Sequence, residues 1–521
     1  MKRLNLFLIL LVFSLVLFSC NHKKKESKLD DYEKKTIDYL NYSTEFEGED
    51  GQIETYFFEN EEIPYVSYEA FLNGVSYYSS SLDIKFNSKN GIFDYEIKSD
   101  FNTTHHIIDS NKDTIKISNY GLFDVDEVSY KILPEYSYML NVNFEWLNPE
   151  KISIINLKNY SLDIRKIDDK VLIPFHVLES LFSFESYYNV YYLGNSYVGL
   201  SYDDYLNIRE LSKNVNIPQT ESFLNYNYNF IRYLFNEFYG LDGFFDDFDV
   251  DDYLLDNKER FLNKDTYAQA INDLEENIND PHTSFYNYGI NPSDYVFSSS
   301  KRSKQMSVAY MSARRQKENY STVEYLDSTT AMISFNSFMV DEYGFAYKFI
   351  NNYFDDLKEN GIKNVVLDIT TNGGGDTFSL AQILGLMTNE DIVFDLLNLK
   401  NGAHSVQTFK VDANLDGSYD DLDAYTDFNY YVLCSNYSFS CASGFAYYCK
   451  EKNLATLIGE KTGGGACTVY YSMLPYFTFL QVGGPNVFSG EYEYELGVDV
   501  QYEIPQDKLL DKDAILEIVN N

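Results

Sequence analysis

Positive charge is scarce in this sequence. The chain has 41 Lys and Arg residues against 80 Asp and Glu residues, which gives a formal net charge of −39. Such a chain repels phosphate backbones, so binding to nucleic acid is not expected. Hydrophobic residues still make up 45% of the 521 positions, including 49 Tyr and 39 Phe, so the chain can form sizeable cores and is not expected to be disordered. The length predicts two to four domains.

Cysteine is also rare, with five residues in the whole chain. No Cys-x-x-Cys pair occurs and no histidine lies between Cys434 and Cys467, so a zinc site is not expected. Four of the five fall within the 34 residues from Cys434 to Cys467. In an oxidising compartment, one pair of these four could form a disulfide.

The N-terminus carries an apolar stretch, Leu6 to Phe18, after two positive residues. It is too short to span a bilayer comfortably, which is typical of an export signal. The sequence Leu17-Phe18-Ser19-Cys20 resembles a bacterial lipobox, although an uncleaved helical anchor is the alternative. Both interpretations place the rest of the chain outside the cytoplasm. We therefore expect a signal peptide at 1–19, attachment to a bacterial membrane by lipid on Cys20, and a polar tether at 20–44.

The rest of the chain changes character several times. Residues 45–215 contain short runs of alternating polarity between Gly, Asn and Asp, which predict a β-rich α+β domain. Apolar residues recur at helical spacing in 216–295, which predicts a helical subdomain. The polar, locally basic stretch 296–324 is expected to be a linker loop. From 325 to 515, apolar strands alternate with amphipathic helices, as in an α/β domain built of β-α-β units.

Three turns in the α/β domain carry residue types suited to catalysis. The first is Gly373-Gly374-Gly375 after a buried strand, which lacks the Lys-Ser/Thr ending of a phosphate loop. In the second, Ser440 lies at a strand-to-helix turn, where it would be exposed and the N–H of Cys441 could stabilise an oxyanion. This turn has no Gly-x-Ser-x-Gly sequence, so an α/β-hydrolase is not expected. The third is Ile458 to Gly465, where a strand again leads into glycines.

In this order and spacing, the three turns resemble the tail-specific (carboxyl-terminal processing) protease family over about residues 325 to 510. The resemblance implies a crotonase-like spiral core, serine peptidase activity and no catalytic cofactor. The nucleophile in that family is the serine nineteen residues before the glycine of the Ile-Gly motif. Gly459 is that glycine here, so the position falls on Ser440. The oxyanion would be held by the N–H groups of Cys441 and of Gly373 or Gly374.

The general base departs from the family pattern. Enzymes of the family with a serine–lysine dyad carry the lysine six residues after that glycine, where this chain has Gly465. Lys461 is available, but its position is not catalytic in the family. The tricorn-core branch uses a histidine from an N-terminal helical segment, and the segment Ile278-Asn279-Asp280-Pro281-His282-Thr283 is similar to its motif. His282 is therefore the expected base. The alternative is a histidine that only ends a helix and bonds to the backbone.

The orienting carboxylate also follows from the resemblance, whereas the cysteine assignments follow from their places in the sequence. Glu495 resembles the acidic residue that orients the histidine in the tricorn-core branch, and Glu493 and Asp499 stay open for that role. Cys441 and Cys467 are expected on adjoining strands and form the preferred disulfide pair. Cys441 as the nucleophile is a minor alternative.

A separate acidic loop fits the calcium-loop pattern, with oxygen side chains at positions 1, 3, 5, 9 and 12 and glycine at 6. These side chains belong to Asp412, Asn414, Asp416, Asp420 and Asp423. The twelfth residue is Asp instead of the longer Glu, and a solvated acidic turn is the alternative. Bound calcium would have a structural role.

Two functions follow from these expectations. The first is an extracytoplasmic, lipid-anchored serine endopeptidase that acts on protein or peptide substrates. The alternative is a catalytically inactive lipoprotein of protease fold that binds peptides or surface ligands. About forty residues separate His282 from Tyr325, too few for the PDZ domain that family members often carry there. Recognition of free C-termini is therefore in doubt.

Overall fold

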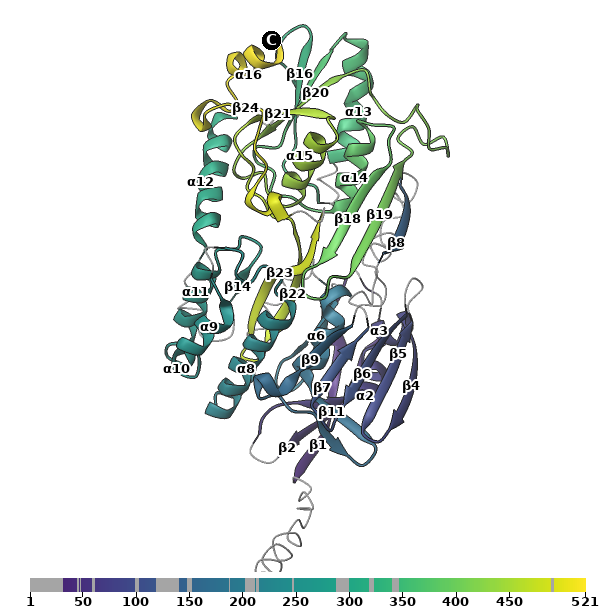
Figure 1. Cartoon of the computed structure of the whole chain (residues 1–521), viewed down its shortest axis with the longest axis vertical. Coiled ribbons are helices and arrows are strands. Elements are labelled where there is room, and N and C mark those ends of the chain that lie inside the picture. The colour runs from purple at the N-terminus through teal and green to yellow at the C-terminus, as the bar shows by residue number, and fades with distance from the viewer. Residues whose placement is uncertain are drawn as a thin grey trace, which may run out of the picture.

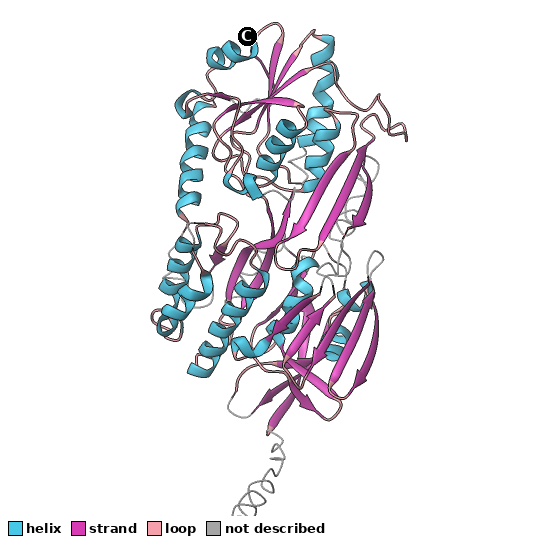
Figure 2. Ribbon diagram, viewed as in Figure 1, coloured by secondary structure: helices cyan, strands magenta, loops and turns pink. Residues whose placement is uncertain are grey.

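The computed structural model describes residues 31–44, 46, 48–58, 61–98, 103–118, 140–147, 152–186, 188–201, 211, 215–245, 248–286, 299–317, 323–339, 346–488 and 492–521. The expected signal peptide and Cys20 lie outside these ranges. Within them, none of the helices has both the length and the apolar character needed to cross a membrane. Figure 2 shows a strand-rich N-terminal region at one end of the molecule and an α/β region at the other.

The N-terminal region contains two sheets. The first has seven strands in the order β10 (Arg165–Ile167), β11 (Lys170–Pro174), β3 (Tyr65–Ser67), β2 (Gly51–Phe58), β1 (Tyr32–Asn41), β13 (Tyr197–Ser201) and β12 (Tyr188–Tyr192). The second has five antiparallel strands, β4 (Asp83–Lys89), β5 (Ile92–Lys98), β6 (Thr103–Asp109), β7 (Thr114–Ile117) and β9 (Ser153–Asn156). The helices of this region are α2 (Tyr68–Gly74), α3 (Ser76–Ser81), η1 (Leu157–Tyr160) and α6 (Phe175–Ser186).

The expected tether at 20–44 is wrong for residues 32–41, which form β1 inside the seven-stranded sheet. Ile37 and Tyr39 are buried, and Ile37 pairs with Ile53 of β2. The alternation that marks a half-buried strand is present here. The charged residues at the start of β1 mask this alternation in the sequence.

The helical subdomain contains α8 (Glu221–Phe238), α9 (Val250–Asp256), α10 (Lys258–Phe261) and α11 (Tyr267–Ile278). Asn279 ends α11 in the left-handed conformation, with φ of 55°. Pro281 and His282 follow, and then the short strand β14 (Ser284–Tyr286). The end of α11 thus places His282 just before β14, the edge strand of a sheet.

The expected linker loop at 296–324 is also wrong, because residues 301–316 form the helix α12 (Lys301–Gln316). Ser300 caps it by accepting a hydrogen bond from the Ser303 N–H at 3.0 Å. Its buried residues are only Met306, Ala309 and Ala313, so its apolar stripe is narrow. A mostly polar helix with so few apolar residues gives a weak periodic signal.

The α/β region is built on a six-stranded sheet in the order β15 (Val323–Tyr325), β16 (Thr330–Ser334), β17 (Asn364–Asp368), β20 (Asn429–Cys434), β21 (Ala455–Gly459) and β24 (Tyr502–Glu503). All pairs are parallel except β15 with β16. The helices of this region are α13 (Ala346–Glu359), α14 (Thr377–Gly385), α15 (Cys441–Glu451), η4 (Tyr492–Leu496), η5 (Gln506–Lys508) and α16 (Lys512–Val519). The glycine and serine turns follow the carboxyl ends of β17, β20 and β21, so they meet at one edge of the sheet.

A further sheet, not anticipated from the sequence, joins the regions. It runs β14, β23 (Thr478–Phe488), β18 (Ile392–Asn398), β19 (His404–Val411) and β8 (Leu140–Trp146), and β22 (Cys467–Leu474) also pairs with β23. Figure 1 shows β22 and β23 between the helices α8 to α11 and the α/β region. Because β14 pairs with β23, the chain just after His282 is fixed to a strand of the α/β region.

Candidate active site

Ser440 lies at the turn between β20 and α15. Its backbone has φ of 55° and ψ of −127°, a conformation that is costly for a residue with a side chain and is often found at functional turns. Its N–H donates a hydrogen bond to Gly464 O at 2.7 Å. The Ser438 hydroxyl donates to Ile369 O at 2.8 Å and anchors the turn to the loop after β17. The result is a half-buried serine at the N-terminal end of a helix.

The triple-glycine loop packs directly against this turn. A Cβ on Gly374 would lie 2.7 Å from Ser440 Cβ and 3.1 Å from Cys441 N, so only glycine permits this approach. The Gly374 N–H donates to Asn372 Oδ1 at 2.9 Å and is therefore occupied. The N–H groups of Gly373 and Cys441 have no hydrogen-bond partner among the described residues. Of the three expected oxyanion donors, Gly373 and Cys441 are therefore available.

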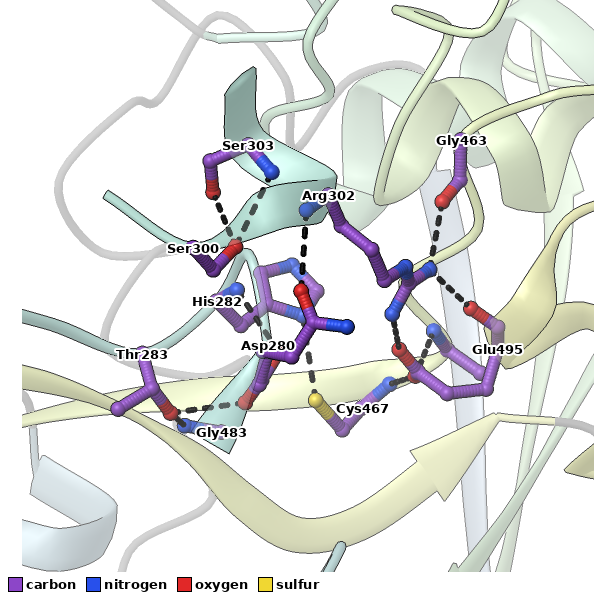
Figure 3. Close-up of polar contacts among 12 residues, drawn as sticks. Asp280, His282, Thr283, Ser300, Arg302, Ser303, Gly463, Cys467, Gly483 and Glu495 are labelled. Carbon is purple, nitrogen blue, oxygen red and sulfur yellow. Dashed lines mark hydrogen bonds and ion pairs between the residues drawn. The ribbon is translucent and has the colours of Figure 1, made fainter. Parts of the chain in front are cut away.

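A buried polar turn holds the backbone of His282. Asp280 Oδ1 accepts from the His282 N–H at 2.9 Å, and Oδ2 accepts from the Thr283 hydroxyl at 2.7 Å. Thr283 Oγ1 in turn accepts from the Gly483 N–H of β23 at 3.2 Å (Figure 3). Asp280 is fully buried, and this burial raises the pKa of its carboxyl group.

The imidazole of His282 lies beside the third turn. Its Nδ1 is 3.2 Å from Cys467 Sγ, and its ring centroid is 4.4 Å from that of Phe439, the residue before Ser440. A Cβ on Gly465 would lie 2.8 Å from His282 Cε1. Burial, with a smaller effect from the charge of Arg302, lowers the pKa of His282 to about 3, so the ring is neutral at ordinary pH. No described residue is hydrogen-bonded to His282 Nε2 or to Ser440 Oγ.

Glu495 is close to His282 but does not bond to it. Its Oε2 accepts from the backbone N–H groups of Ala466 at 2.6 Å and Cys467 at 3.2 Å. The expectation that Glu495 directly orients the imidazole is therefore wrong for this structure. Burial and, second, the charge of Asp280 raise its pKa to about 8.

Lys461, considered as a base, and Asp499, considered as the orienting carboxylate, are paired with each other on the surface. Asp499 pairs with Lys461 at 3.4 Å, and the side chains of both are well exposed, at 76% and 48%. This pairing removes Lys461 as an alternative base and Asp499 as an orienting residue. The side chain of Glu493 lies outside the described residues.

Arg302, at the start of α12, is a site residue that the sequence did not reveal. Its Nη2 donates to Gly463 O and Glu495 O, both at 2.9 Å, and its Nη1 lies 3.9 Å from Glu495 Oε1 (Figure 3). Its own N–H donates to Asn279 Oδ1 at 3.0 Å. Arg302 thus ties the chain before His282 to the loop before Gly465. The only local signal was the serine cap of α12.

The other end of α12 is tied to the triple-glycine loop. Lys317 Nζ lies 3.0 Å from Asp368 Oδ2 and donates to Thr371 Oγ1 at 3.1 Å. Asp368 is fully buried; the charge of Lys317 and hydrogen bonds overcome the effect of burial and lower its pKa. The helix expected to be a loop therefore braces two of the three turns at the site.

A cavity of about 320 Å³ opens beside Ser440. Cys441, Gly465 and Cys467 also line it, close to the reactive groups. Much of the remaining wall is apolar and includes Leu380, Val393, Phe394, Phe488 and Tyr494. A cavity of this size and character suits an apolar side chain of a bound peptide.

The expected disulfide between Cys441 and Cys467 is not formed, since the four cysteines that the structure describes are all free and buried. Cys441 Sγ donates to Gly375 O at 2.9 Å, whereas Cys467 Sγ contacts His282. Burial, with a smaller effect from Asp376, raises the pKa of Cys441 to about 12. A protonated thiol bonded to a carbonyl is a poor nucleophile, which argues against Cys441 in that role.

The acidic loop after β19 turns its carboxylates toward its own backbone. Asp412 accepts from the N–H groups of Asp416 and Gly417, and Asp423 accepts from those of Ala413 and Asp420. Within the described ranges, no group of three or more His, Cys, Asp or Glu residues is arranged to hold a metal ion. Calcium at Asp412, Asn414, Asp416, Asp420 and Asp423 stays a prediction.

Buried titratable groups predict how stability depends on pH. Burial raises the pKa of Glu179 to about 8, as for Glu495, and lowers the pKa of His106 and His176 to about 3, as for His282. Above pH 4.5 the glutamates ionise only in the unfolded chain, and below pH 6.5 the histidines gain protons only there. Because these three histidines outnumber the two glutamates, the free energy of unfolding should rise from about pH 4.5 to a maximum at about pH 6 and fall toward pH 8.

Urea unfolding across pH 4 to 9 measures this profile. In Glu179→Gln, the decline toward pH 8 should be shallower than in the wild type. A wild-type stability that rises steadily from pH 6.5 to 8 would contradict the assignment.

Residues 329–495 match the family model of peptidase family S41. Over these residues the chain is similar to peptidase family S41. The matched segment includes all three turns at the site, from Gly373 through Ser440 to Gly465, and ends at Glu495. This match supports a serine-type peptidase, a class whose substrates are proteins or peptides. No curated protein matches the sequence.

Several solved structures resemble this chain at low identity. A lipoprotein from Streptococcus agalactiae is 12% identical over 58% of this chain and 98% of its own, with a TM-score of 0.36. The photosystem II D1 C-terminal processing protease is 16% identical over 39% of this chain, with a TM-score of 0.29, and the match spans 51% of its length. The tricorn protease is 12% identical over 94% of this chain and 59% of its own, with a TM-score of 0.32. The similarity to family S41 depends on the match over residues 329–495.

Proposed function

We propose that this chain is a peptidase of family S41, an active endopeptidase that cleaves peptide bonds through an acyl-enzyme on Ser440, with His282 as the general base. We also propose that its core has the crotonase-like spiral of the family. The lipobox-like sequence supports a location outside the cytoplasm, with the chain attached to a bacterial membrane by lipid on Cys20.

The observation that carries the proposal is the position of the imidazole relative to Gly465. The resemblance to the tail-specific proteases places their dyad lysine at this residue. A Cβ there would lie only 2.8 Å from His282 Cε1, so the first atoms of a lysine side chain and the ring would compete for the same space. The imidazole therefore lies where the lysine of a dyad would begin, and it can supply the missing base from the helical subdomain.

The chemistry then follows from the groups at the site. Ser440 Oγ has no described hydrogen-bond partner, so it is free to turn toward His282 Nε2 and lose its proton as it attacks the carbonyl carbon. The N–H groups of Cys441 and Gly373 would hold the oxyanion at the N-terminal end of α15. His282 then protonates the leaving amine. Water, deprotonated by the same ring, releases the acyl group and restores the hydroxyl.

Binding of peptides without hydrolysis is the second candidate function. One observation favours it: Ser440 and His282 are not hydrogen-bonded to each other, and no carboxylate reaches the imidazole. Catalytic hydrogen bonds are often long or poorly aligned without substrate, so this geometry does not exclude hydrolysis.

A fluorophosphonate probe, which labels an activated serine, separates the two functions. The wild type should be labelled in the membrane fraction, and Ser440→Ala should lose all labelling because the attacking oxygen is gone. Ser443→Ala is the matched control, since its hydroxyl lies one turn further along α15 and bonds to Thr462 Oγ1 at 2.7 Å. Cys20→Ala should keep its labelling and move to the soluble fraction.

Failure to label the wild type, with the fold intact by circular dichroism, would favour the peptide-binding protein. Labelling that persists in Ser440→Ala would assign the nucleophile to another residue. A Cys20→Ala variant that stays in the membrane fraction would contradict the lipid anchor.

A further inference from the structure

We propose that Cys467 is the positioning residue for His282: its sulfur accepts a hydrogen bond from the Nδ1–H and so keeps Nε2 unprotonated and aimed at Ser440. A carboxylate has this role in Ser-His-Asp triads. The inference deepens the proposed function and rests on it, because it assigns the orienting group of the same site to a thiol.

The contact between the two side chains is built into the fold. Cys467 begins β22 and is 3% exposed, and His282 is 4% exposed. Their Sγ and Nδ1 atoms are 3.2 Å apart, within the range of a hydrogen bond to sulfur (Figure 3). The N–H of Cys467 is itself held by Glu495 Oε2. Glu495 thus acts one step further back, by fixing the backbone that carries the sulfur.

Both nearby carboxylates are engaged elsewhere. Asp280 accepts from the backbone N–H of His282 and from the Thr283 hydroxyl. Glu495 accepts from two backbone N–H groups and faces Arg302. Among the described residues, the only hydrogen-bond partner of the imidazole ring is therefore the sulfur of Cys467.

The direction of the hydrogen bond follows from the strength of the donors. An imidazole N–H is a stronger donor than a thiol, which donates only weakly. No described group accepts a hydrogen bond from the Cys467 thiol, so nothing in the structure turns its proton toward the imidazole. A thiol sulfur carries two lone pairs, so one can accept from Nδ1–H whenever the thiol proton points away from the ring. The ring then has its free lone pair on Nε2, as a general base requires.

The tautomer of His282 tests the inference without any catalysis. In protein labelled with ¹⁵N-histidine, NMR should show the His282 Nδ1 protonated and Nε2 unprotonated, with the signals assigned by their loss in His282→Gln. In Cys467→Ala, the Nδ1–H form should lose its dominance. Cys449→Ala is the matched control, because this equally buried cysteine of α15 does not line the cavity.

The rate of fluorophosphonate labelling gives a second readout. Cys467→Ala should lower the maximal labelling rate about tenfold, with little change in the probe concentration for half-maximal rate, because only the base is disturbed. Cys467→Ser should recover part of the loss, since its hydroxyl oxygen also accepts a hydrogen bond.

The outcomes separate this inference from the proposed function. A wild type that is not labelled, but whose Nδ1–H form depends on Cys467, would overturn hydrolysis and keep the positioning role. A wild type that is labelled, with an Nε2–H ring or a tautomer unchanged in Cys467→Ala, would overturn the positioning role and keep hydrolysis.

Discussion

Gly465→Ala is expected to lower the rate of fluorophosphonate labelling at Ser440 about 100-fold. A Cβ at this position would lie 2.7 Å from two atoms of the Phe439 ring and 2.8 Å from His282 Cε1, so both rings would have to move. A displacement of about 1 Å in a catalytic group can cost about 100-fold in rate. The positive φ of 89° adds a backbone cost of about 1–2 kcal/mol, which would appear in the free energy of unfolding.

Gly361→Ala is the matched control for this backbone cost. Gly361 has φ of 76°, and a Cβ there would meet nothing within 4 Å. This variant should lose similar stability and keep the labelling rate of the wild type. Equal labelling of Gly465→Ala and the wild type would show that the imidazole is not held against Gly465.

Gly465→Lys tests whether a lysine side chain at position 465 and the His282 ring compete for one space. If the ring and a lysine compete for one space, the lysine variant should be labelled as slowly as Gly465→Ala. Fast labelling of the double variant Gly465→Lys with His282→Gln would instead show that a lysine can serve as the base in this fold.

The strands and helices of the α/β region were predictable because their patterns are local. The strand expected before the three glycines is β17, and the strand expected before the turn at Ser440 is β20. The long sheet was not predictable, since β8 and β19 pair although Trp146 and Ser405 are far apart in the chain. Such register depends on tertiary packing, which no local pattern records.

At the site, too, features with a local sequence pattern were predictable and contacts across the fold were not. Motifs in the sequence indicated Ser440, His282 and the glycine turns, because each lies in a short stretch with a recognisable spacing. The partners of His282 depend on contacts across the fold. The sequence therefore assigned Glu495 to the imidazole, whereas the short helix η4 places its carboxylate on backbone N–H groups. The contact of Cys467 with His282 and the bonds of Arg302 have no local signal.

The second large effect is expected in His282→Gln, which removes the proton acceptor. Positioned acid–base groups contribute about 10² to 10⁴ in rate, so labelling of Ser440 should fall by that factor. His176→Gln is the matched control, because His176 is equally buried, is bonded to Tyr226 and also has a pKa of about 3. It should keep the labelling rate of the wild type even where it loses stability.

The labelling rate of His282→Gln relative to the wild type and His176→Gln thus measures directly whether His282 is the base. A fall of at least about 100-fold in His282→Gln alone is the result that a histidine base requires. A His282→Gln protein that is folded and labelled at the wild-type rate would contradict the claim.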